Sequence, residues 1–261
     1  MGPGRPVAMG RSKLIRIVDR ILDRKHALSR PHADVRSDGG VVSFTFDDFP
    51  ASALHSGGTI LEEAGWHGTY YSCAGLLGSE SSVGRIATYD ELLECLSRGH
   101  EIANHTLSHC DCREASGQQI VAELRDNESA LGHLTRNFAF PYGAANVREQ
   151  RLVQPLVTTA RSVLHGVNGA DTDRLNLRAN PIYSSKGIAP LVEMIRAAAE
   201  NGGWLILYTH DVVVDPSPFG CSPDEFRAIV AAVAASGMDV ATVEQARLRF
   251  YLGDATAAGG V

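Results

Sequence analysis

Two adjacent carboxylates, Asp47 and Asp48, directly follow an apolar run in the segment VVSFTFDDFP, residues 41–50. The residue types at 41–46 predict a strand that is buried on both faces, and Pro50 prevents its continuation. Neighbouring carboxylates repel each other, so a structure keeps them together most readily when a cation or a shared proton relieves the repulsion. The alternative interpretation is the start of a solvated loop.

A second motif, NHTLSH, places His105 and His109 four residues apart after an expected strand. Imidazoles at this spacing face the same side of a helical turn. Two imidazoles and one carboxylate form a ligand set for Zn²⁺ or a similar divalent ion, with positions left for water. Among ten histidines such a pair also arises by chance. Together with Asp47 and Asp48, however, it predicts a metal site in which one aspartate binds the ion and the other accepts a proton.

Two further apolar runs end in polar or turn-forming residues. The first is FPYG at 140–143, and the second is WLILYT at 204–209, which His210 and Asp211 follow. In parallel α/β folds, functional sites collect at the carboxyl ends of the strands. Since four strand ends carry such residues, we expect them to form one common site.

Strand-like and helix-like segments alternate from residue 41 onward, which predicts a parallel sheet, open or closed into a barrel. Thr88 with Glu91, and Ser222 with Glu225, are typical of capping boxes at helix starts. The expected strands are 41–46, 67–73, 100–105, 137–143, 161–168, 204–211 and 238–243. The expected helices are 52–65, 88–99, 117–135, 189–203 and 222–237.

The composition is that of a globular protein with a sizeable core, because 44% of the 261 residues are hydrophobic. A net charge of −6 argues against nucleic-acid binding. Five cysteines, an odd number, fit a reducing cytosol better than a disulfide framework. The start MGPGRPVAMG lacks the apolar core of a secretory signal, and no stretch reaches the length of a membrane span. We therefore expect a cytoplasmic protein.

The first 36 residues are basic, with nine Lys or Arg against three Asp. Within them, an apolar face formed by Leu14, Ile17, Val18, Ile21 and Leu22 predicts an amphipathic helix. This helix is expected to cover one end of the domain, and the alternative is contact with the inner face of an anionic membrane. We expect a basic extension over 1–40, one catalytic domain over 41–250 and a flexible tail over 251–261.

The motifs TFDD, NHTLSH and FPYG, and the strand that ends in His210, resemble in this order the motifs of the polysaccharide deacetylases, carbohydrate esterase family 4. The chitooligosaccharide deacetylases of nodulation belong to this family. The resemblance spans about residues 41–245. It implies an α/β fold, a distorted (β/α) barrel with about seven parallel strands. It also implies metal-dependent removal of acetyl groups from N-acetylated sugars, such as oligo- or polysaccharides that contain N-acetylglucosamine.

The resemblance carries roles over to individual residues. Asp47 resembles the catalytic base that accepts a proton from activated water, and His210 resembles the acid that protonates the leaving amine. The Tyr142 backbone N–H would stabilise the oxyanion. The divalent metal, expected to be Zn²⁺ with Co²⁺, Ni²⁺ or Mn²⁺ as alternatives, would be bound by Asp48, His105 and His109. The residues implied in substrate binding are Pro141 and Tyr142, with Leu207 or Tyr208 lining the pocket for the acetyl methyl. A plain core role for Leu207 or Tyr208 is the alternative.

The sequence departs from the family's pattern beside the expected base. Phe49 stands where the family commonly has Gly after the two aspartates. Ala139 stands where the family usually has an Arg that braces the base. Either another cation takes this place, with Arg161 and Arg178 as the candidates, or the base is tuned differently.

The brace of the expected acid is also altered. The family's Asp-Trp pair is replaced by Asp171 followed by Thr172. Asp171 or Asp173 could orient His210, and each could equally be a solvated loop residue. These departures leave two alternatives to a saccharide deacetylase. One is a hydrolase of a non-sugar amide on the same barrel, and the other is a catalytically weakened homologue that binds saccharides.

Overall fold

The computed structural model describes residues 39–132, 136–143, 145–169 and 171–250. The amphipathic helix expected around 14–22 and the tail expected over 251–261 lie outside these residues. The domain boundaries, the membrane contact and the cytoplasmic location therefore stay predictions. All five cysteines are described, and each is a free thiol.

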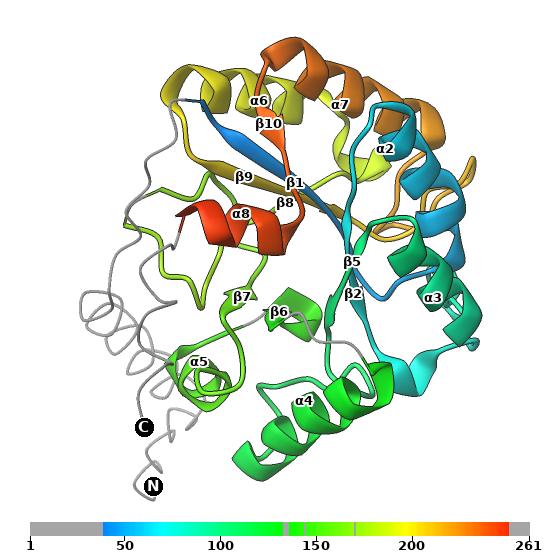
Figure 1. Ribbon diagram of the computed structural model, residues 1–261, viewed down its shortest axis with the longest axis vertical. Helices are drawn as coiled ribbons and strands as arrows, with labels where there is room; N and C mark the ends of the chain where they lie inside the picture. The colour runs from blue at the N-terminus through cyan, green and yellow to red at the C-terminus, as the bar shows by residue number, and fades with distance from the viewer. Residues whose placement is uncertain (1–38, 133–135, 144, 170, 251–261) are drawn as a thin grey trace, which may run out of the picture.

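A curled parallel sheet forms the centre of the molecule, and its outer side is covered by helices (Figure 1). β1 pairs along its whole length with β9 on one edge, and with β10 and then β2 on the other. This arrangement confirms the expected α/β distorted barrel. In sheet order the strands are β7 (Thr159–Arg161), β6 (Asn137–Ala139), β5 (Glu101–Asn104), β2 (Thr69–Ser72), β1 (Val41–Phe46), β9 (Trp204–Thr209) and β8 (Asn180–Pro181), with β10 (Asp239–Val240) beside β1.

The helices begin and end where local signals indicate. The capping boxes of Thr88 with Glu91 and of Ser222 with Glu225 are both formed. The helices are α2 (Thr59–Glu63), which continues a π-helical turn at Ala53–Gly58, α3 (Tyr89–Ser97), α4 (Gly117–Leu131), α5 (Val147–Val153), α6 (Ala189–Asn201), α7 (Pro223–Ser236) and α8 (Val243–Phe250). A small hairpin pairs β3 (Glu80–Ser81) with β4 (Gly84–Arg85).

β1 is buried on both faces, as its residue types predict. Phe44 and Phe46 point outward into the main core beneath the helices, and each contributes about 1.5–3 kcal/mol by burial. On the inner face, the Ser43 hydroxyl donates to the Ala241 carbonyl at 2.8 Å. Its oxygen also accepts a hydrogen bond from the Trp204 indole at 2.9 Å. A fully buried strand of this kind holds Asp47 and Asp48 at a fixed position at its carboxyl end.

Four short elements were not predicted, and one strand was placed wrongly. The strand expected over 161–168 is β7, which lies at Thr159–Arg161 instead. Beyond it, Gly166 has a φ of +132° and exchanges hydrogen bonds with the side chain of Asn180, so the chain leaves the sheet. The hairpin, α5, β8 and α8 were missed because each is too short for a clear periodicity.

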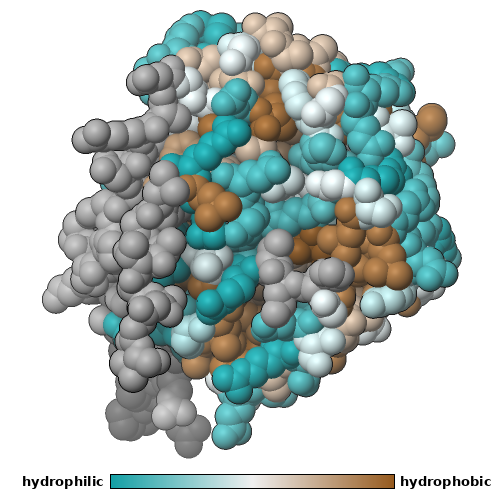
Figure 2. Space-filling view, in the orientation of Figure 1, coloured by the Kyte–Doolittle hydropathy of each residue, from teal (hydrophilic) through white to brown (hydrophobic). Residues whose placement is uncertain are grey.

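None of the helices in the described part of the chain is long and apolar enough to cross a membrane. On the face shown in Figure 2, hydrophobic residues form separate patches between hydrophilic ones. The inner side of the barrel is closed at one end by α8, where the rings of Phe250 and Trp204 stack with centroids 5.6 Å apart. The opposite end, where the strands end, carries the residues described next.

Candidate active site

Left-handed backbone conformations occur where the strands of the barrel end. Among the described residues, those other than glycine with a φ near +60° are Asp48, Phe49, Thr106, His109 and Tyr142. All five belong to the three motifs DDF, NHTLSH and PYG. A left-handed conformation costs a residue with a side chain about 1–2 kcal/mol, and such strain clusters at functional sites. The backbone therefore marks the same end of the barrel as the sequence motifs.

Phe49 explains one departure from the family's pattern. Its φ of +57° is a conformation that glycine adopts without strain, so the common Gly at this place has a clear physical reason. Here the side chain is completely buried and packs against Tyr70, with ring centroids 4.8 Å apart. Burying this ring offsets the cost of the turn, and the turn directs Asp48 into the site.

Asp48, His105 and His109 meet in one cluster, with their ligand atoms all within 4.8 Å of one another. The Asp48 Oδ1 lies 3.4 Å from Nε2 of His105 and 3.2 Å from Nε2 of His109. This oxygen is buried and has no hydrogen-bond partner. Two atoms that each lie about 2.0–2.2 Å from one ion are separated by about 2.9–3.5 Å. The spacing and the unpartnered oxygen both fit a divalent metal.

Backbone hydrogen bonds orient the two imidazoles. The Nδ1–H of His105 donates to the Ala139 carbonyl at 2.8 Å, which leaves its Nε2 lone pair directed at Asp48. The turn that carries His109 is held by Thr106, whose hydroxyl oxygen accepts the Cys110 N–H at 2.9 Å. Burial and the neighbouring His105 lower the pKa of His109, so its neutral form, which binds metals, is favoured.

Asp47 is buried next to this cluster and forms an ion pair with Arg161. Burial by itself raises the pKa of Asp47, but Arg161 and the nearby His105 and His210 outweigh it and hold the pKa below its usual value. The guanidinium of Arg161 lies between the rings of Tyr71 and Tyr208, 4.9 Å from each centroid. Asp47 is therefore an ionised carboxylate held in one orientation.

The position of Arg161 accounts for the missing Arg at Ala139. The two residues are direct neighbours in the parallel pairing of β6 and β7, so their side chains point to the same face of the sheet. The small side chain at 139 leaves room for the guanidinium from 161 to reach Asp47. Arg178, the other alternative, donates instead to the His165 carbonyl at 2.9 Å.

His210 follows β9 on the other side of the cluster. Its Nε2 lies 4.0 Å from Oδ2 of Asp48, and its Nδ1–H donates to the Phe219 carbonyl at 3.1 Å. The aromatic neighbours of its ring are Tyr183 and Phe219, with centroid distances of 6.1 and 5.6 Å. Asp171 is exposed and lines a separate pocket of about 430 Å³ together with Arg178. The structure therefore does not bring Asp171 to His210, because a backbone carbonyl occupies the orienting position.

The expected substrate-binding residues divide into two groups. Pro141 is buried, whereas Tyr142 is 61% exposed and places its ring 4.6 Å from that of His109. Tyr208 is buried against Arg161. Leu207 is completely buried in the main core on the outer face of β9, so it has no surface left for a substrate. Alternation along β9 sends these two adjacent side chains to opposite faces.

Sequence reasoning missed three aromatic neighbours of the site. Tyr71 could have been found, because it lies in a predicted strand that is adjacent to β1. Tyr183 packs on Tyr208, with centroids 5.5 Å apart, and Phe219 lies beside His210 at 5.6 Å. Both come from irregular segments in which the sequence carries no periodic signal.

Comparison with known proteins agrees with this geometry. The model of the polysaccharide deacetylase family matches residues 34–157. A chitooligosaccharide deacetylase from Rhizobium leguminosarum bv. trifolii is 26% identical over 203 residues, which cover 75% of this chain and 79% of the relative. The barrel, the ordered motifs and this match define a hydrolase of the α/β barrel class. These matches support a polysaccharide deacetylase of carbohydrate esterase family 4.

Solved structures share the fold at low sequence identity. A family 4 carbohydrate esterase from Streptomyces lividans, in complex with acetate, superposes with a TM-score of 0.55 at 18% identity, covering 78% of this chain and 93% of that one. A family 4 pseudoenzyme from Bacillus anthracis reaches a TM-score of 0.57 at 12% identity, covering 80% and 66%. The fold is thus common to proteins described as enzymes and to a protein described as a pseudoenzyme.

Proposed function

We propose that this protein is a metal-dependent N-deacetylase of saccharides that contain N-acetylglucosamine. The observation that carries the proposal is the buried Oδ1 of Asp48, which faces two imidazole nitrogens and has no hydrogen-bond partner. The match to a relative named as a chitooligosaccharide deacetylase supports the substrate class.

Asp48, His105 and His109 would hold the divalent ion. Imidazole and carboxylate ligands suit Zn²⁺ first, with Co²⁺, Ni²⁺ and Mn²⁺ as alternatives. Such an ion polarises a carbonyl oxygen and lowers the pKa of water. Asp48 is ionised, as a metal ligand must be. Burial alone raises its pKa, but the nearby imidazoles of His105, His109 and His210 hold the pKa well below the usual value.

The remaining groups handle protons and charge. Asp47, kept ionised by Arg161, accepts a proton from the water whose oxygen bonds to the acyl carbon. The Tyr142 N–H donates to the oxygen that becomes negative in the tetrahedral intermediate. His210, with Nδ1–H held by the Phe219 carbonyl, gives the proton on Nε2 to the amine nitrogen as the carbon–nitrogen bond breaks. The products are acetate and the free amino sugar.

Metal analysis of the purified protein, paired with acetate release from a panel of N-acetylated chitooligosaccharides, tests this proposal. We expect one divalent ion per chain, and loss of acetate release after chelation with recovery on adding Zn²⁺ or Co²⁺. Asp47→Asn should keep the metal and lower kcat by about 10²–10⁴-fold, because the general base is lost. A metal-free protein that still releases acetate would contradict the proposal.

The two other functions differ from this one in measurable ways. A hydrolase of a non-sugar amide on the same barrel would release ammonia or another carboxylate, and no acetate from chitooligosaccharides. A weakened saccharide-binding homologue would keep metal without turnover. Asp47, Asp48, His105, His109 and His210 are all present and meet at one end of the barrel, which favours an active enzyme. A cytoplasmic location is part of the proposal, and cell fractionation tests it.

A further inference from the structure

The loop that follows His210 contacts the expected acid twice. The backbone N–H of His210 donates to the Phe219 carbonyl at 3.2 Å, and the imidazole Nδ1–H donates to the same oxygen at 3.1 Å. The loop runs over residues 211–221. One carbonyl therefore fixes both the main chain and the ring of His210, and the position of Phe219 is tied to that of the acid.

A network inside the loop holds this carbonyl in place. The buried carboxylate of Asp211 accepts hydrogen bonds from the Ser217 N–H at 2.8 Å and from its hydroxyl at 2.6 Å. The Asp211 carbonyl accepts the Cys221 N–H at 3.0 Å. Gly220 is needed here, because a Cβ at this position would lie 2.4 Å from Oδ1 of Asp211. The loop is therefore rigid at the point where Phe219 emerges.

The side chain of Phe219 is not used by this network. Its ring packs beside His210 and Tyr183, with centroid distances of 5.6 and 6.0 Å, and is 47% exposed. A half-exposed phenylalanine next to an acid–base residue offers an apolar face at the place where the substrate must lie. Tyr142 offers a second exposed ring beside His109, on the metal-ligand side of the cluster.

We propose that Phe219 is a specificity-determining residue whose ring stacks on a sugar of the saccharide chain on the leaving-amine side of the site. The inference rests on the proposed function. His210 protonates the amine, so the amino sugar must lie on the His210 side. Phe219 is the exposed aromatic ring that contacts His210. Aromatic rings offer a large apolar face, which can pack on the apolar C–H surface of a sugar ring.

The test compares Phe219→Ala with Phe219→Trp and with Tyr89→Ala, a matched control. Tyr89 is also 47% exposed, but it lies on α3. Substrates are tetra-N-acetylchitotetraose and 4-nitrophenyl acetate, which has no sugar. We expect Phe219→Ala to lower kcat/KM for the tetrasaccharide by about 3–10-fold through KM, which corresponds to the energy of one aromatic contact. The ratio of kcat/KM between the two substrates should fall by a similar factor. Phe219→Trp should keep the ratio.

A second variant separates the effect of the Phe219 ring from that of the Phe219 backbone carbonyl, which holds His210. Ser217→Ala removes a hydroxyl that holds the loop but keeps the Phe219 ring, so it should lower kcat on the tetrasaccharide with little change in its KM. Binding of tetra-N-acetylchitotetraose by calorimetry to the Asp47→Asn variant, with and without Phe219→Ala, tests the inference even if the wild type releases no acetate. Weaker binding without the ring supports stacking, and unchanged binding and an unchanged substrate ratio overturn it. An inactive wild type that binds through Phe219 overturns only the proposed function.

Discussion

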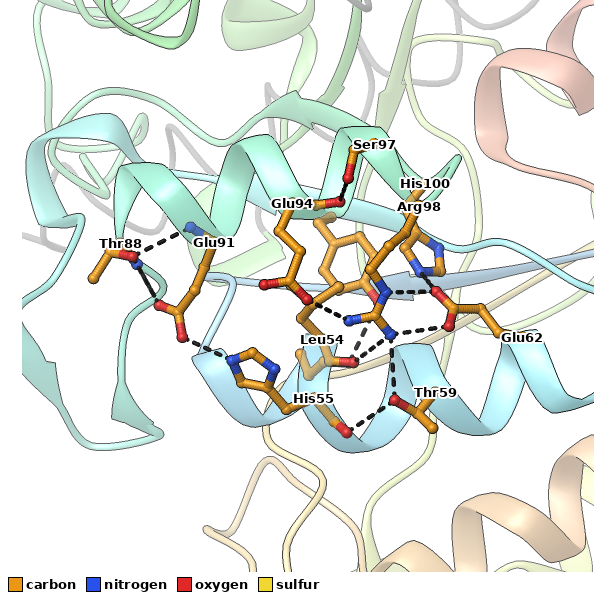
Figure 3. Close-up of polar contacts among 12 residues, drawn as sticks. Leu54, His55, Thr59, Glu62, Thr88, Glu91, Glu94, Ser97, Arg98 and His100 are labelled. Carbon is orange, nitrogen blue, oxygen red and sulfur yellow. Dashed lines mark hydrogen bonds and ion pairs between the residues drawn. The ribbon is translucent and has the colours of Figure 1, made fainter.

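Two clusters in this molecule combine a carboxylate with imidazole, and they differ in how completely the carboxylate is bonded. In the first, between α2 and α3, the Glu62 carboxylate accepts hydrogen bonds from Arg98 at 2.7 and 3.0 Å and from His100 at 2.9 Å (Figure 3). In the second, the Asp48 Oδ1 faces two imidazoles at 3.2 and 3.4 Å and forms no hydrogen bond.

The backbone conformations of the two clusters also differ: they are regular in the first cluster and strained in the second. Glu62 lies in the last turn of α2 and His100 directly precedes β5, whereas Asp48 and His109 have left-handed backbone conformations. The Nδ1 of His100 accepts the Gly68 N–H at 3.0 Å, so both of its nitrogens are used within the protein. A cluster whose polar groups are hydrogen-bonded within the protein stabilises the fold. A buried carboxylate oxygen that faces two imidazoles without a hydrogen bond, on a strained backbone, is suited to bind an external cation.

The largest expected effect separates the two clusters by metal content. His105→Gln removes an imidazole ligand and should lower bound metal to a small fraction and kcat/KM by at least about 10³-fold, since imidazole binds Zn²⁺ far better than an amide does. His100→Gln is the matched control in the other cluster and should leave metal content unchanged. Elemental analysis with acetate release measures both. Equal metal loss in the two variants would show that the two clusters do not differ in metal binding.

A smaller effect concerns the ion pair beside the metal site. Arg161→Met leaves the buried Asp47 without its cation, which should lower the free energy of unfolding by about 3–5 kcal/mol and reduce acetate release. Chemical denaturation measures the first quantity. In the double variant Asp47→Asn with Arg161→Met no uncompensated carboxylate remains, so most of the stability should return. A stability loss that persists in the double variant would show that the packing of Arg161 between Tyr71 and Tyr208 matters more than its charge.

The smallest effect concerns the pH dependence of stability that comes from the Glu62, Arg98 and His100 cluster. Burial lowers the pKa of His100 from 6.5 to about 4, against the favourable charge of Glu62. Between these values the unfolded chain binds a proton that the native protein does not. Stability contributed by His100 is therefore complete above pH 6.5 and is lost as the pH falls toward 4, by about 2–4 kcal/mol. Denaturation between pH 7 and 4 should show a shallower slope for His100→Gln. Identical slopes in the two proteins would argue against the lowered pKa.

Much of the fold follows from local patterns. The strand at 41–46, the capping boxes at Thr88 and Ser222, and the apolar run at 204–209 each encode an element through neighbouring residues. The strand at 161–168 was misplaced because its apolar residues suit a strand, while the bonding partners that end β7 come from Asn180 and Leu177. A pattern of residue types cannot contain contacts with segments that lie more than ten residues away.

The sequence by itself determined the strand-end motifs and their order, because Asp47 and Asp48, His105 and His109, and His210 each directly follow a strand. Only the tertiary structure decided which cation holds Asp47 and which acceptor holds His210. Arg161 reaches Asp47 because β6 and β7 pair Ala139 with Arg161, and the Phe219 carbonyl reaches His210 because the loop after β9 folds back on Asp211. Strand register and loop closure depend on the whole chain, so they set the orienting contacts that residue spacing leaves open.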